Sequence, residues 1–409
     1  MDVYLVGGAV RDELLGLDVV ERDWVVVGST PAAMEAAGYR PVGKDFPVFL
    51  HPETNEEYAL ARTERKSGVG YHGFTFHTGP DVSLEDDLVR RDLTINAMAR
   101  RTSGELVDPH AGQADIDARL LRHVSPAFAE DPVRVLRLAR FAARFAALGF
   151  QVAPETVELA QQMVAAGEID HLQADRVWKE TERALAGPRP RVFFEVLRET
   201  GALARVFPEI DRLYGVPQPA KHHPEIDTGL HAMLVLDAAA ELSPDVAVRF
   251  AALAHDLGKG LTPPDQWPSH HGHEQTSARV VGELAERLPL PRAVRDLAII
   301  VAREHGRVHK ALELRPGTVL NVLNAIDVWR RPERLDAVLA ACEADSRGRT
   351  GFEDAAYPAS DYLRACYAAA RAVSTDALIA DGFSGQALGD ELARRRQAAI
   401  AVVKRQYAD

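Results

Sequence analysis

The sequence predicts an α+β protein, with a small mixed β-sheet in an N-terminal head and α-helices in the remainder. Short apolar and β-branched runs crowd the N-terminal part, with too few helical stretches between them for a long βαβ array. From about residue 130 the chain is rich in alanine, poor in aromatic residues and helical in pattern. Its 409 residues, 46% of them hydrophobic, suffice for two or three domains.

The first predicted elements are a strand, a glycine turn, a short helix and a second strand. An apolar run at 3–6 ends at Gly7 and Gly8. Residues 9–15 have helical composition, and the β-branched run at 24–27 is typical of a buried strand. The turn therefore lies at the end of one strand and directly before a helix.

Two acids open the second strand and give this segment its chemistry. Glu21 and Asp23 stand two residues apart, so an extended chain points both carboxylates to the same side. Such carboxylates repel each other, and a bound Mg²⁺, which prefers hard oxygen ligands, removes that cost. The Gly7–Gly8 turn lets the backbone approach a phosphate at the free N–H groups of the helix, and Arg11 adds a positive charge. These are the parts of a metal-dependent phosphoryl-transfer site.

The rest of the head adds a helix at 31–37 and strands at 47–50 and 57–61. The segment 63–80 mixes basic, aromatic and glycine residues, and we interpret it as a loop beside the active site. Such a loop could contact RNA or a nucleotide, while a plain solvated loop fits the same composition.

A basic helix follows the head. Pro132 suits its first position, and the acids Glu130 and Asp131 suit its N-terminus. Three arginines recur every third residue and form a slowly turning stripe, and two phenylalanines fall among them instead of on an opposite face. A solvated face would separate the two kinds more cleanly, so we favour a binding role, with the solvated face as the alternative. The stripe consists of Arg134, Arg137, Arg140, Phe141 and Phe145.

A group of histidines follows in the second half of the chain. His255 and Asp256 end an apolar helical run and precede a Leu-Gly-Lys sequence. His231 comes before this pair, and His273 and His305 come after it. Imidazole-rich sites suit Ni²⁺, Co²⁺ or Mn²⁺ more than Mg²⁺, and a bound metal would lower the pKa of water for phosphoester hydrolysis. Structural histidines with satisfied hydrogen bonds are the alternative.

The overall composition limits the class of protein. The net charge of −12 repels nucleic acid on average, so RNA contact requires a local basic surface. Cys342 and Cys366 are too few for a disulfide framework or a thiolate metal site. We see neither a signal peptide nor an apolar run of about 18 residues, so we expect a cytoplasmic enzyme without membrane contact.

The head motifs resemble those of the DNA polymerase beta-like nucleotidyltransferases, and among them the class II tRNA nucleotidyltransferases and bacterial poly(A) polymerases. The motifs are the Gly-Gly turn, the two acids and the Arg-Arg-Asp-x-Thr-Ile-Asn-Ala run at 90–97. That family usually has Asp where this chain has Glu21, which can ligate a metal on a longer arm. The resemblance implies that Glu21 and Asp23 are catalytic and hold Mg²⁺.

The same resemblance implies how a nucleotide is bound and chosen. Asp131 and Arg134 would pair with the Watson–Crick edge of the incoming base in place of a template. Cytosine and adenine both offer an exocyclic amine donor beside a ring-nitrogen acceptor, which uracil and guanine do not, so CTP and ATP would be selected. Arg91 would contact the triphosphate, and Asp92 and Asn96 would hold sugar or local structure. The implied nucleotide-binding residues are Gly8, Arg11, Arg91, Asp131, Arg134, Arg137 and Arg140.

The His-Asp pair with its Leu-Gly-Lys sequence resembles the HD phosphohydrolase superfamily. In that superfamily the pair binds a divalent metal together with an earlier histidine, a later histidine and often a distant aspartate. The resemblance implies 2′,3′-cyclic phosphodiesterase, 2′-nucleotidase and phosphatase activities, with Ni²⁺ or another transition metal. The implied ligands are His231, His255, Asp256 and His305, with His273 and Asp345 as further candidates.

A nucleotidyltransferase head followed by an HD domain resembles the bacterial multifunctional CCA proteins. This resemblance spans nearly the whole chain and implies template-independent addition of C, C and A to the tRNA 3′ end from CTP and ATP. We expect a monomer or a homodimer. The expected domains are a catalytic head at 1–140, a helical neck at 141–220, an HD domain at 221–345 and a helical tail at 346–409.

Two alternatives stay open. A poly(A) polymerase, or an enzyme that adds only C or only A, would carry the same head motifs, although the HD domain and the lack of a long basic tail argue against a poly(A) polymerase. A protein of another class would be an HD phosphohydrolase whose inactive head only binds RNA. The intact acids and the Arg-Arg-Asp run argue against that alternative.

Overall fold

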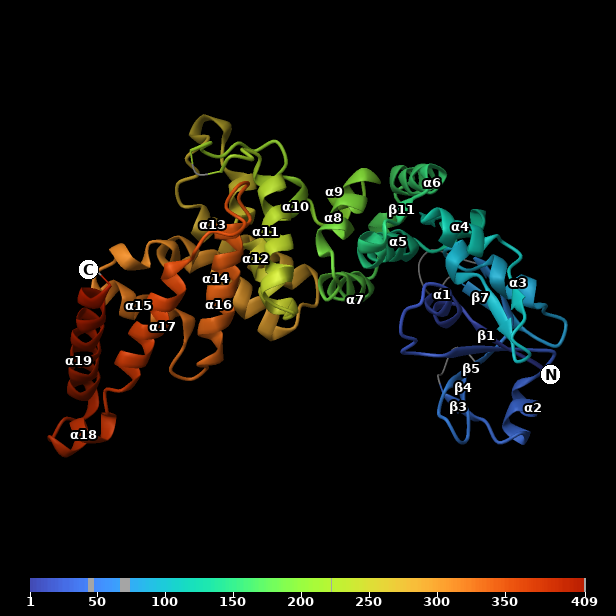
Figure 1. The fold of residues 1–409 in the computed structure, drawn as a ribbon, viewed down its shortest axis with the longest axis horizontal. Helices are drawn as coiled ribbons and strands as arrows, with labels where there is room; N and C mark the ends of the chain where they lie inside the picture. Colours follow the sequence, from blue (N-terminus) through green and yellow to red (C-terminus); the bar gives the residue numbers. More distant parts are fainter. Residues whose placement is uncertain (43–47, 67–73, 222, 408–409) are drawn as a thin grey trace. The chain divides into compact units, whose positions relative to one another are not determined.

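The computed structural model describes residues 1–42, 48–66, 74–221 and 223–407, and the chain divides into two compact units (Figure 1). The first unit comprises Met1–Thr181 and Val192–Val206, and the second comprises Glu182–Arg191 and Phe207–Asp409. The four domains expected from the sequence divide the chain more finely, and their boundaries stay predictions.

The first unit is built on a mixed sheet of seven strands. The strands are β1 (Asp2–Val6), β2 (Asp23–Val27), β3 (Arg40–Val42), β4 (Val48–Leu50), β5 (Glu57–Leu60), β8 (Ala99–Arg101) and β9 (Leu106–Val107). Their order across the sheet is β3-β4-β5-β2-β1-β8-β9. β1 pairs antiparallel with β2 and β8, whereas β2 pairs in parallel with β5. The predicted mixed sheet is confirmed.

Side chains that alternate along the strands give this sheet two buried faces. Val6 and Val25 lie on one face and pack in a cluster with Leu88, whereas Val26 lies on the other face in a cluster with Phe49. With both faces covered, β1 and β2 are fixed in register, and the residues at their ends are held in place.

The segment at 63–80 differs from the predicted loop. Its ends form β6 (Arg62–Lys66) and β7 (Phe74–Thr78), an antiparallel pair in which Thr63 lies opposite His77. Threonine and aromatic residues favour such a pleated pair, and they outweigh the basic and glycine content that indicated a loop. The loop prediction is wrong for these two stretches, and its central glycines at 68, 70 and 73 lie outside the described residues.

Helices continue the first unit beyond the sheet, and the two at its boundary, 174–185 and 190–199, extend into the second unit. Two of the helices carry side-chain caps: the Thr30 hydroxyl accepts a hydrogen bond from the Ala33 amide (3.2 Å), and Ser83 and Asp86 form a capping box. The helices are α1 (Gly8–Leu14), α2 (Pro31–Ala36), α3 (Leu84–Val89), α4 (Gly112–Ala118), α5 (Val133–Phe145), α6 (Pro154–Ala165), α7 (Ala174–Leu185), α8 (Pro190–Glu199) and α9 (Leu203–Val206). β10 (Leu120–Leu121) and β11 (Gln151–Val152) form a short parallel pair.

In its described part, the second unit is helical. Its helices are α10 (Pro208–Asp211), α11 (Thr228–Leu242), α12 (Val246–Ala254), α13 (His273–Arg287), α14 (Arg292–His309), α15 (Pro316–Ile326), α16 (Glu333–Arg347), α17 (Pro358–Arg371), α18 (Thr375–Ala380) and α19 (Gly385–Gln406). Asp227 and Asp245 cap α11 and α12 through their carboxylates. Helices α11, α12, α14 and α16 pack against one another and form the core of this unit (Figure 1).

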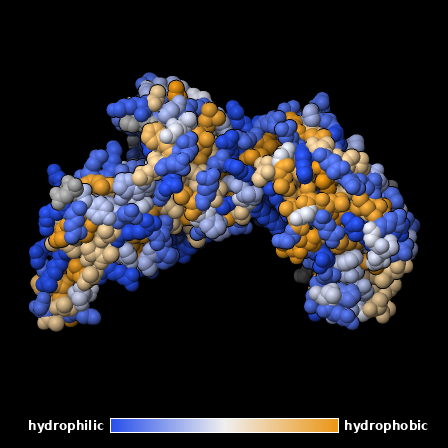
Figure 2. All heavy atoms as spheres, in the orientation of Figure 1, coloured by the Kyte–Doolittle hydropathy of each residue, from blue (hydrophilic) through white to orange (hydrophobic). Residues whose placement is uncertain are grey.

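Hydrophilic and hydrophobic side chains are interspersed over the face of the second unit that Figure 2 shows. Among the described helices, none combines the length and the apolar character that a membrane crossing needs.

Candidate functional site

The first candidate site lies at the end of β1. Gly7 follows this strand with a φ of 67°, which favours glycine, and a Cβ atom there would lie 2.9 Å from Nη1 of Arg91. Asp23 is the first residue of β2 and is paired in register with Val6. The sheet therefore brings Asp23, the glycine turn and Arg91 to one place.

The two acids of this site are both accessible to solvent. The sequence had suggested that both acids open the second strand. β2 begins at Asp23, however, so Glu21 lies in the segment before the strand. The pKa of Asp23 is raised, first by loss of hydration at the sheet end and then by the charge of Glu21, while Arg91 lowers it. The two carboxylates thus interact, as the prediction of a shared Mg²⁺ requires.

Asp87 holds Arg91 in this position. The carboxylate of Asp87 is fully buried and accepts hydrogen bonds from Nη2 of Arg91 (3.0 Å) and from Arg90. Although burial opposes ionisation, these two ion pairs keep the pKa of Asp87 below its usual value. Arg91 is a predicted nucleotide ligand, whereas Asp87 was not found from the sequence.

Arg11 lies deeper than a surface phosphate ligand would. Its side chain is 3% exposed, and its guanidinium donates to Asp12 (2.9 Å) and to Oδ1 of Asn96 (2.5 Å). Cζ of its guanidinium lies 5.2 Å from the ring centre of Phe141 and 5.0 Å from that of Phe145. Gly8, the first residue of α1, lies next to this guanidinium.

The arginines of α5 are held by carboxylates and carbonyls. Arg137 donates through Nε to Asp92 (2.7 Å), and Arg140 donates through Nε to Glu180 on α7 (2.5 Å). Burial opposes ionisation of Asp92, but Arg137 and a hydrogen bond from Asn96 keep the pKa of Asp92 below its usual value. Asp92 therefore holds Arg137 directly and is linked to Arg11 through Asn96, whereas Arg140 is held separately by Glu180.

The two residues predicted to read the base, Asp131 and Arg134, each form hydrogen bonds within the protein. Asp131 accepts two hydrogen bonds from Arg176 on α7, at 2.8 and 3.2 Å. Arg134 donates to the carbonyl oxygens of Ala127 and Arg90, both at 2.6 Å. Arg176 and Glu180 were not found from the sequence, although their spacing of four places both on one face of α7.

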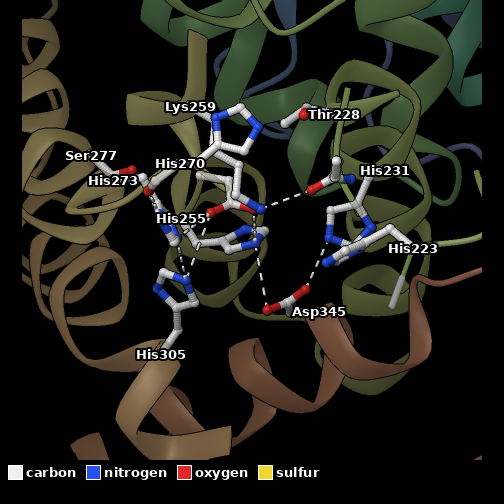
Figure 3. Close-up of polar contacts among 12 residues, drawn as sticks. His223, Thr228, His231, His255, Lys259, His270, His273, Ser277, His305 and Asp345 are labelled. Carbon is white, nitrogen blue, oxygen red and sulfur yellow. Dashed lines mark hydrogen bonds and ion pairs between the residues drawn. The ribbon is translucent and has the colours of Figure 1, made fainter. Parts of the chain in front are cut away.

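The second candidate site lies among the core helices of the second unit (Figure 3). Asp256, two residues after the end of α12, lies at its centre: its carboxylate is 3.1 Å from Nε2 of His255, 3.2 Å from Nε2 of His273 and 3.7 Å from Nε2 of His305. His255 directly follows α12, His273 is the first residue of α13, and His305 lies on α14. The three side chains face one another in Figure 3. The structure thus brings together residues that the sequence had only suggested as a group.

Asp345 joins this cluster from α16. One of its carboxylate oxygens lies 3.0 Å from Nε2 of His231, and the other lies 3.5 Å from Nε2 of His255. Both Asp345 and Asp256 have pKa values well below the usual one: burial opposes ionisation, but nearby histidines, and Lys259 beside Asp256, favour the carboxylate. Two ionised carboxylates therefore face the imidazole rings.

The backbone fixes which nitrogen of these rings faces the carboxylates. Nδ1 of His255 lies 2.6 Å from the carbonyl oxygen of Ala252, and Nδ1 of His273 lies 2.9 Å from that of His270. A carbonyl only accepts, so Nδ1 carries a hydrogen and Nε2 is the nitrogen that faces the carboxylates. Although burial opposes protonation, Asp256 keeps the pKa of both rings above the usual value, so Nε2 also holds a proton, which a bound metal would displace.

His305 follows the same rule, whereas both ring nitrogens of His231 face carboxylates. Nδ1 of His305 lies 3.0 Å from the carbonyl of Ala302, and burial lowers its pKa to about 3, so the ring is neutral with its lone pair on Nε2. Nδ1 of His231 lies 2.9 Å from the Glu225 carboxylate. Nε2 of His273 and Nε2 of His305 are only 3.3 Å apart, and two lone pairs at that distance call for a cation or a proton between them.

These donors fit a metal ion. Among the described residues, three groups of three residues place their ligand atoms within 4.8 Å of one another, and two of these groups share Asp256. The groups are His223, Glu225 and His231; His231, His255 and Asp256; and Asp256, His273 and His305. Neutral imidazole nitrogens beside carboxylates are the donors that transition metals prefer. Glu225 and His223 were missed from the sequence, and only their closeness to His231 along the chain could have suggested them.

Three family models match separate stretches of the chain. The poly A polymerase head domain matches residues 3–122, the probable RNA and SrmB-binding site of polymerase A matches 149–214, and the HD domain matches 228–347. The first match contains the glycine turn and both acids, and the third contains the histidines around Asp256.

The chain is also similar to individual proteins along its full length. It is 64% identical over 407 residues, 100% of each chain, to the multifunctional CCA protein of Thioalkalivibrio sulfidiphilus (strain HL-EbGR7). It resembles the solved complex of a CCA-adding enzyme with CTP (TM-score 0.66, 21% identity, 98% of this chain and 87% of the other). It also resembles the Thermotoga maritima CCA-adding enzyme complexed with tRNA(CCA) (TM-score 0.64, 20% identity, 99% and 91%). At these identities the solved structures establish a common fold.

Proposed function

This chain belongs to the family of multifunctional CCA proteins, and we propose how its residues carry out the two activities of that family. It adds C, C and A to the 3′ end of tRNA, and its HD domain is a phosphohydrolase. The full-length identity of 64% decides against the poly(A) polymerase and the inactive-head protein that the motifs alone left open.

The observation that supports CCA addition in the head is the meeting of two solvent-accessible acids with the glycine turn and Arg91. Glu21 and Asp23 fit Mg²⁺ because they offer hard oxygen ligands that repel each other when no cation is present. Bound Mg²⁺ would activate the tRNA 3′-hydroxyl and neutralise charge on the triphosphate. Arg91, held by Asp87, would bind the triphosphate and stabilise the departing pyrophosphate at the start of α1, where Gly8 lies beside the Arg11 guanidinium.

Base selection would occur at the start of α5. Asp131 would accept from the exocyclic amine of cytosine or adenine, and Arg134 would donate to the ring nitrogen. Each oxygen of Asp131 can accept two hydrogen bonds, so the carboxylate can hold Arg176 and a base together. Arg134 would exchange a carbonyl partner for the base. Arg137 and Arg140, fixed by Asp92 and Glu180, would bind phosphate or support the base pocket.

Ordered nucleotide addition tests this assignment. Purified protein is given tRNAs that end before CCA, after C and after CC, with Mg²⁺ and labelled CTP or ATP. We expect two C and one A from the unaltered chain and no incorporation from Asp23→Asn. Asp18→Asn is the matched control, because it removes an equal charge from an exposed acid five residues earlier. Incorporation that survives Asp23→Asn would contradict the role of this acid, and long A tails would contradict CCA addition.

The phosphohydrolase centre would be formed by His231, His255, Asp256 and His305, with Asp345 and His273 beside them. Their inward-facing Nε2 atoms fit Ni²⁺ or another transition metal better than Mg²⁺. Such a metal, when bound, would lower the pKa of a water molecule and make it a nucleophile for a 2′,3′-cyclic phosphate or another phosphoester. Lys259, whose Nζ lies 2.5 Å from Asp256, would keep that carboxylate ionised.

Hydrolysis of 2′,3′-cyclic AMP, 2′-AMP and p-nitrophenyl phosphate by the metal-stripped chain tests this centre. We expect Ni²⁺, Co²⁺ or Mn²⁺ to restore hydrolysis more than Mg²⁺, and His255→Asn to abolish it while CCA addition persists. His271→Asn, a change at an exposed histidine, is the matched control. Hydrolysis by the His255→Asn variant would contradict the proposed ligands. A cytoplasmic location, where tRNA is matured, and a monomer or homodimer stay predictions, and sedimentation tests the oligomeric state.

A further inference from the structure

A chain of hydrogen bonds runs outward from the histidine cluster through Asp345. The carboxylate of Asp345 lies 2.7 Å from Nε2 of His309, the last residue of α14. Nδ1 of His309 lies 2.9 Å from the hydroxyl of Tyr357, which directly precedes α17. His309 contacts Asp345 but belongs to none of the groups of ligand atoms described above, and neither does Tyr357.

The direction of this chain follows from its inner end. An ionised carboxylate only accepts, so Nε2 of His309 must donate to Asp345. In the tautomer that carries its single hydrogen on Nε2, the ring has its lone pair on Nδ1, and the hydroxyl of Tyr357 donates to it. Burial raises the pKa of Tyr357, so the hydroxyl keeps its hydrogen. Both hydrogen bonds therefore point inward, toward Asp345.

We propose that His309 and Tyr357 are positioning residues of the phosphohydrolase centre, which hold the Asp345 carboxylate in the orientation that faces His231 and His255. The inference rests on the proposed function, because it needs a metal-binding centre at these residues. It goes further by adding two side chains that act on the centre only through Asp345. Partners of this kind fix the orientation of ligands and raise their affinity for a metal.

The placement of these two residues supports the proposal. His309 follows His305 by four residues, so one face of α14 presents one histidine to Asp256 and the next to Asp345. Tyr357 ends the connection between α16 and α17, and the same connection donates the amide of Thr350 to the Glu225 carboxylate (3.3 Å). Because Glu225 holds Nδ1 of His231, this single connection supports the cluster at two points.

Metal affinity is the direct test, because it does not depend on turnover. Ni²⁺ binding to the metal-stripped full chain is measured by calorimetry for Tyr357→Phe, which removes only the hydroxyl. We expect binding to weaken about tenfold, the lower end of the effect of such outer partners. Tyr362→Phe is the matched control, because it removes the hydroxyl of another buried tyrosine, five residues later, whose side-chain partner is Cys366 and not a residue of the histidine cluster.

Variants at His309 separate positioning from packing. We expect His309→Ala to weaken Ni²⁺ binding at least as much as Tyr357→Phe, and the double variant to bind no worse than His309→Ala, because both residues act through one carboxylate. His309→Gln, whose amide can still donate to Asp345, should recover part of the loss. The melting temperature of the metal-stripped chain should fall only by the loss of one hydrogen bond in Tyr357→Phe, and the rate of CCA addition should stay unchanged.

The outcomes distinguish this inference from the function on which it rests. If the unaltered chain binds no Ni²⁺ and hydrolyses no phosphoester, the proposed centre fails, and the inference fails with it. If the unaltered chain binds Ni²⁺ and Tyr357→Phe binds it equally well, the inference alone is overturned. Additive losses in the double variant would also overturn it, because they would mean that the two residues act by separate routes.

Discussion

The ion pair between Arg176 and Asp131 provides the most demanding test of how the head chooses a base. Replacing Arg176 with methionine keeps much of the side-chain volume but removes both hydrogen bonds to the carboxylate, at 2.8 and 3.2 Å. If Asp131 reads the exocyclic amine, a carboxylate that is no longer held will read it less selectively. Discrimination between CTP and UTP should then fall.

The size of the effect follows from the burial of the pair. The side chain of Arg176 is 27% exposed and that of Asp131 is 21% exposed, so the pair lies between a surface and a buried ion pair. Exposed pairs contribute about 0–1 kcal/mol, and breaking a buried pair costs about 3–5 kcal/mol. An intermediate loss of about 1.5 kcal/mol corresponds to a roughly tenfold loss of discrimination.

The assay compares kcat/KM for CTP and UTP on a tRNA that ends before CCA. Arg205→Met is the matched control, because Arg205 forms a more exposed pair with Asp170 in the same unit, at 3.6 Å. We expect that control to leave discrimination unchanged. If Arg176→Met reduces the rate with CTP and UTP equally, the ratio will not change, and the proposed coupling between the ion pair and base selection is refuted.

Three further predictions concern other parts of the fold. Gly7→Ala puts an alanine in the left-handed region and places its Cβ 2.9 Å from Arg91, so the KM for CTP in steady-state incorporation should rise. The control Gly16→Ala has the same φ of 67° but no atom within 4 Å, so it should add backbone strain without changing that KM. Because the pKa of Asp87 is lowered, its ion pairs stabilise the fold above pH ~4, and this stabilisation is lost as the pH falls below that value. The unfolding midpoint of Asp87→Asn should therefore depend less on pH, between about 5 and 2, than that of the unaltered chain. Phe250→Ala, at a side chain that is 1% exposed, should destabilise the second unit by about 3–5 kcal/mol, and equal melting curves would contradict its place in the core.

The fold of the head could be predicted from the sequence because its signals are local. The apolar run before Gly7 and the β-branched run after Asp23 each identify a strand, and the mixed sheet follows from their number and spacing. The segment at 63–80 failed because its basic and glycine content resembles a loop, while cross-strand pairing decides the structure of its ends.

The chemistry of the sites was predicted less completely, because many partners are distant in the sequence. Asp131 and Arg176 are 45 residues apart on separate elements, and no local pattern joins them. Asp345 and His231 are 114 residues apart, so only the resemblance suggested Asp345 as a candidate, and its contact with His231 follows from the packing of α11 against α16. The positions of the acids in the head and of the His-Asp pair were readable because their spacing is short.

The two sites also differ in how they tolerate genetic change. The rings of His255, His273 and His305 are held by main-chain carbonyls, which every amino acid has. No substitution at those anchoring positions deletes the acceptor, so a population can drift there without losing the protonation pattern of the cluster. The arginines of the head rely on carboxylates such as Asp92 and Glu180, and each of these can be lost in a single mutation. Random mutagenesis should therefore find fewer inactivating changes at Ala252, His270 and Ala302, which anchor these three rings, than at Asp92 and Glu180.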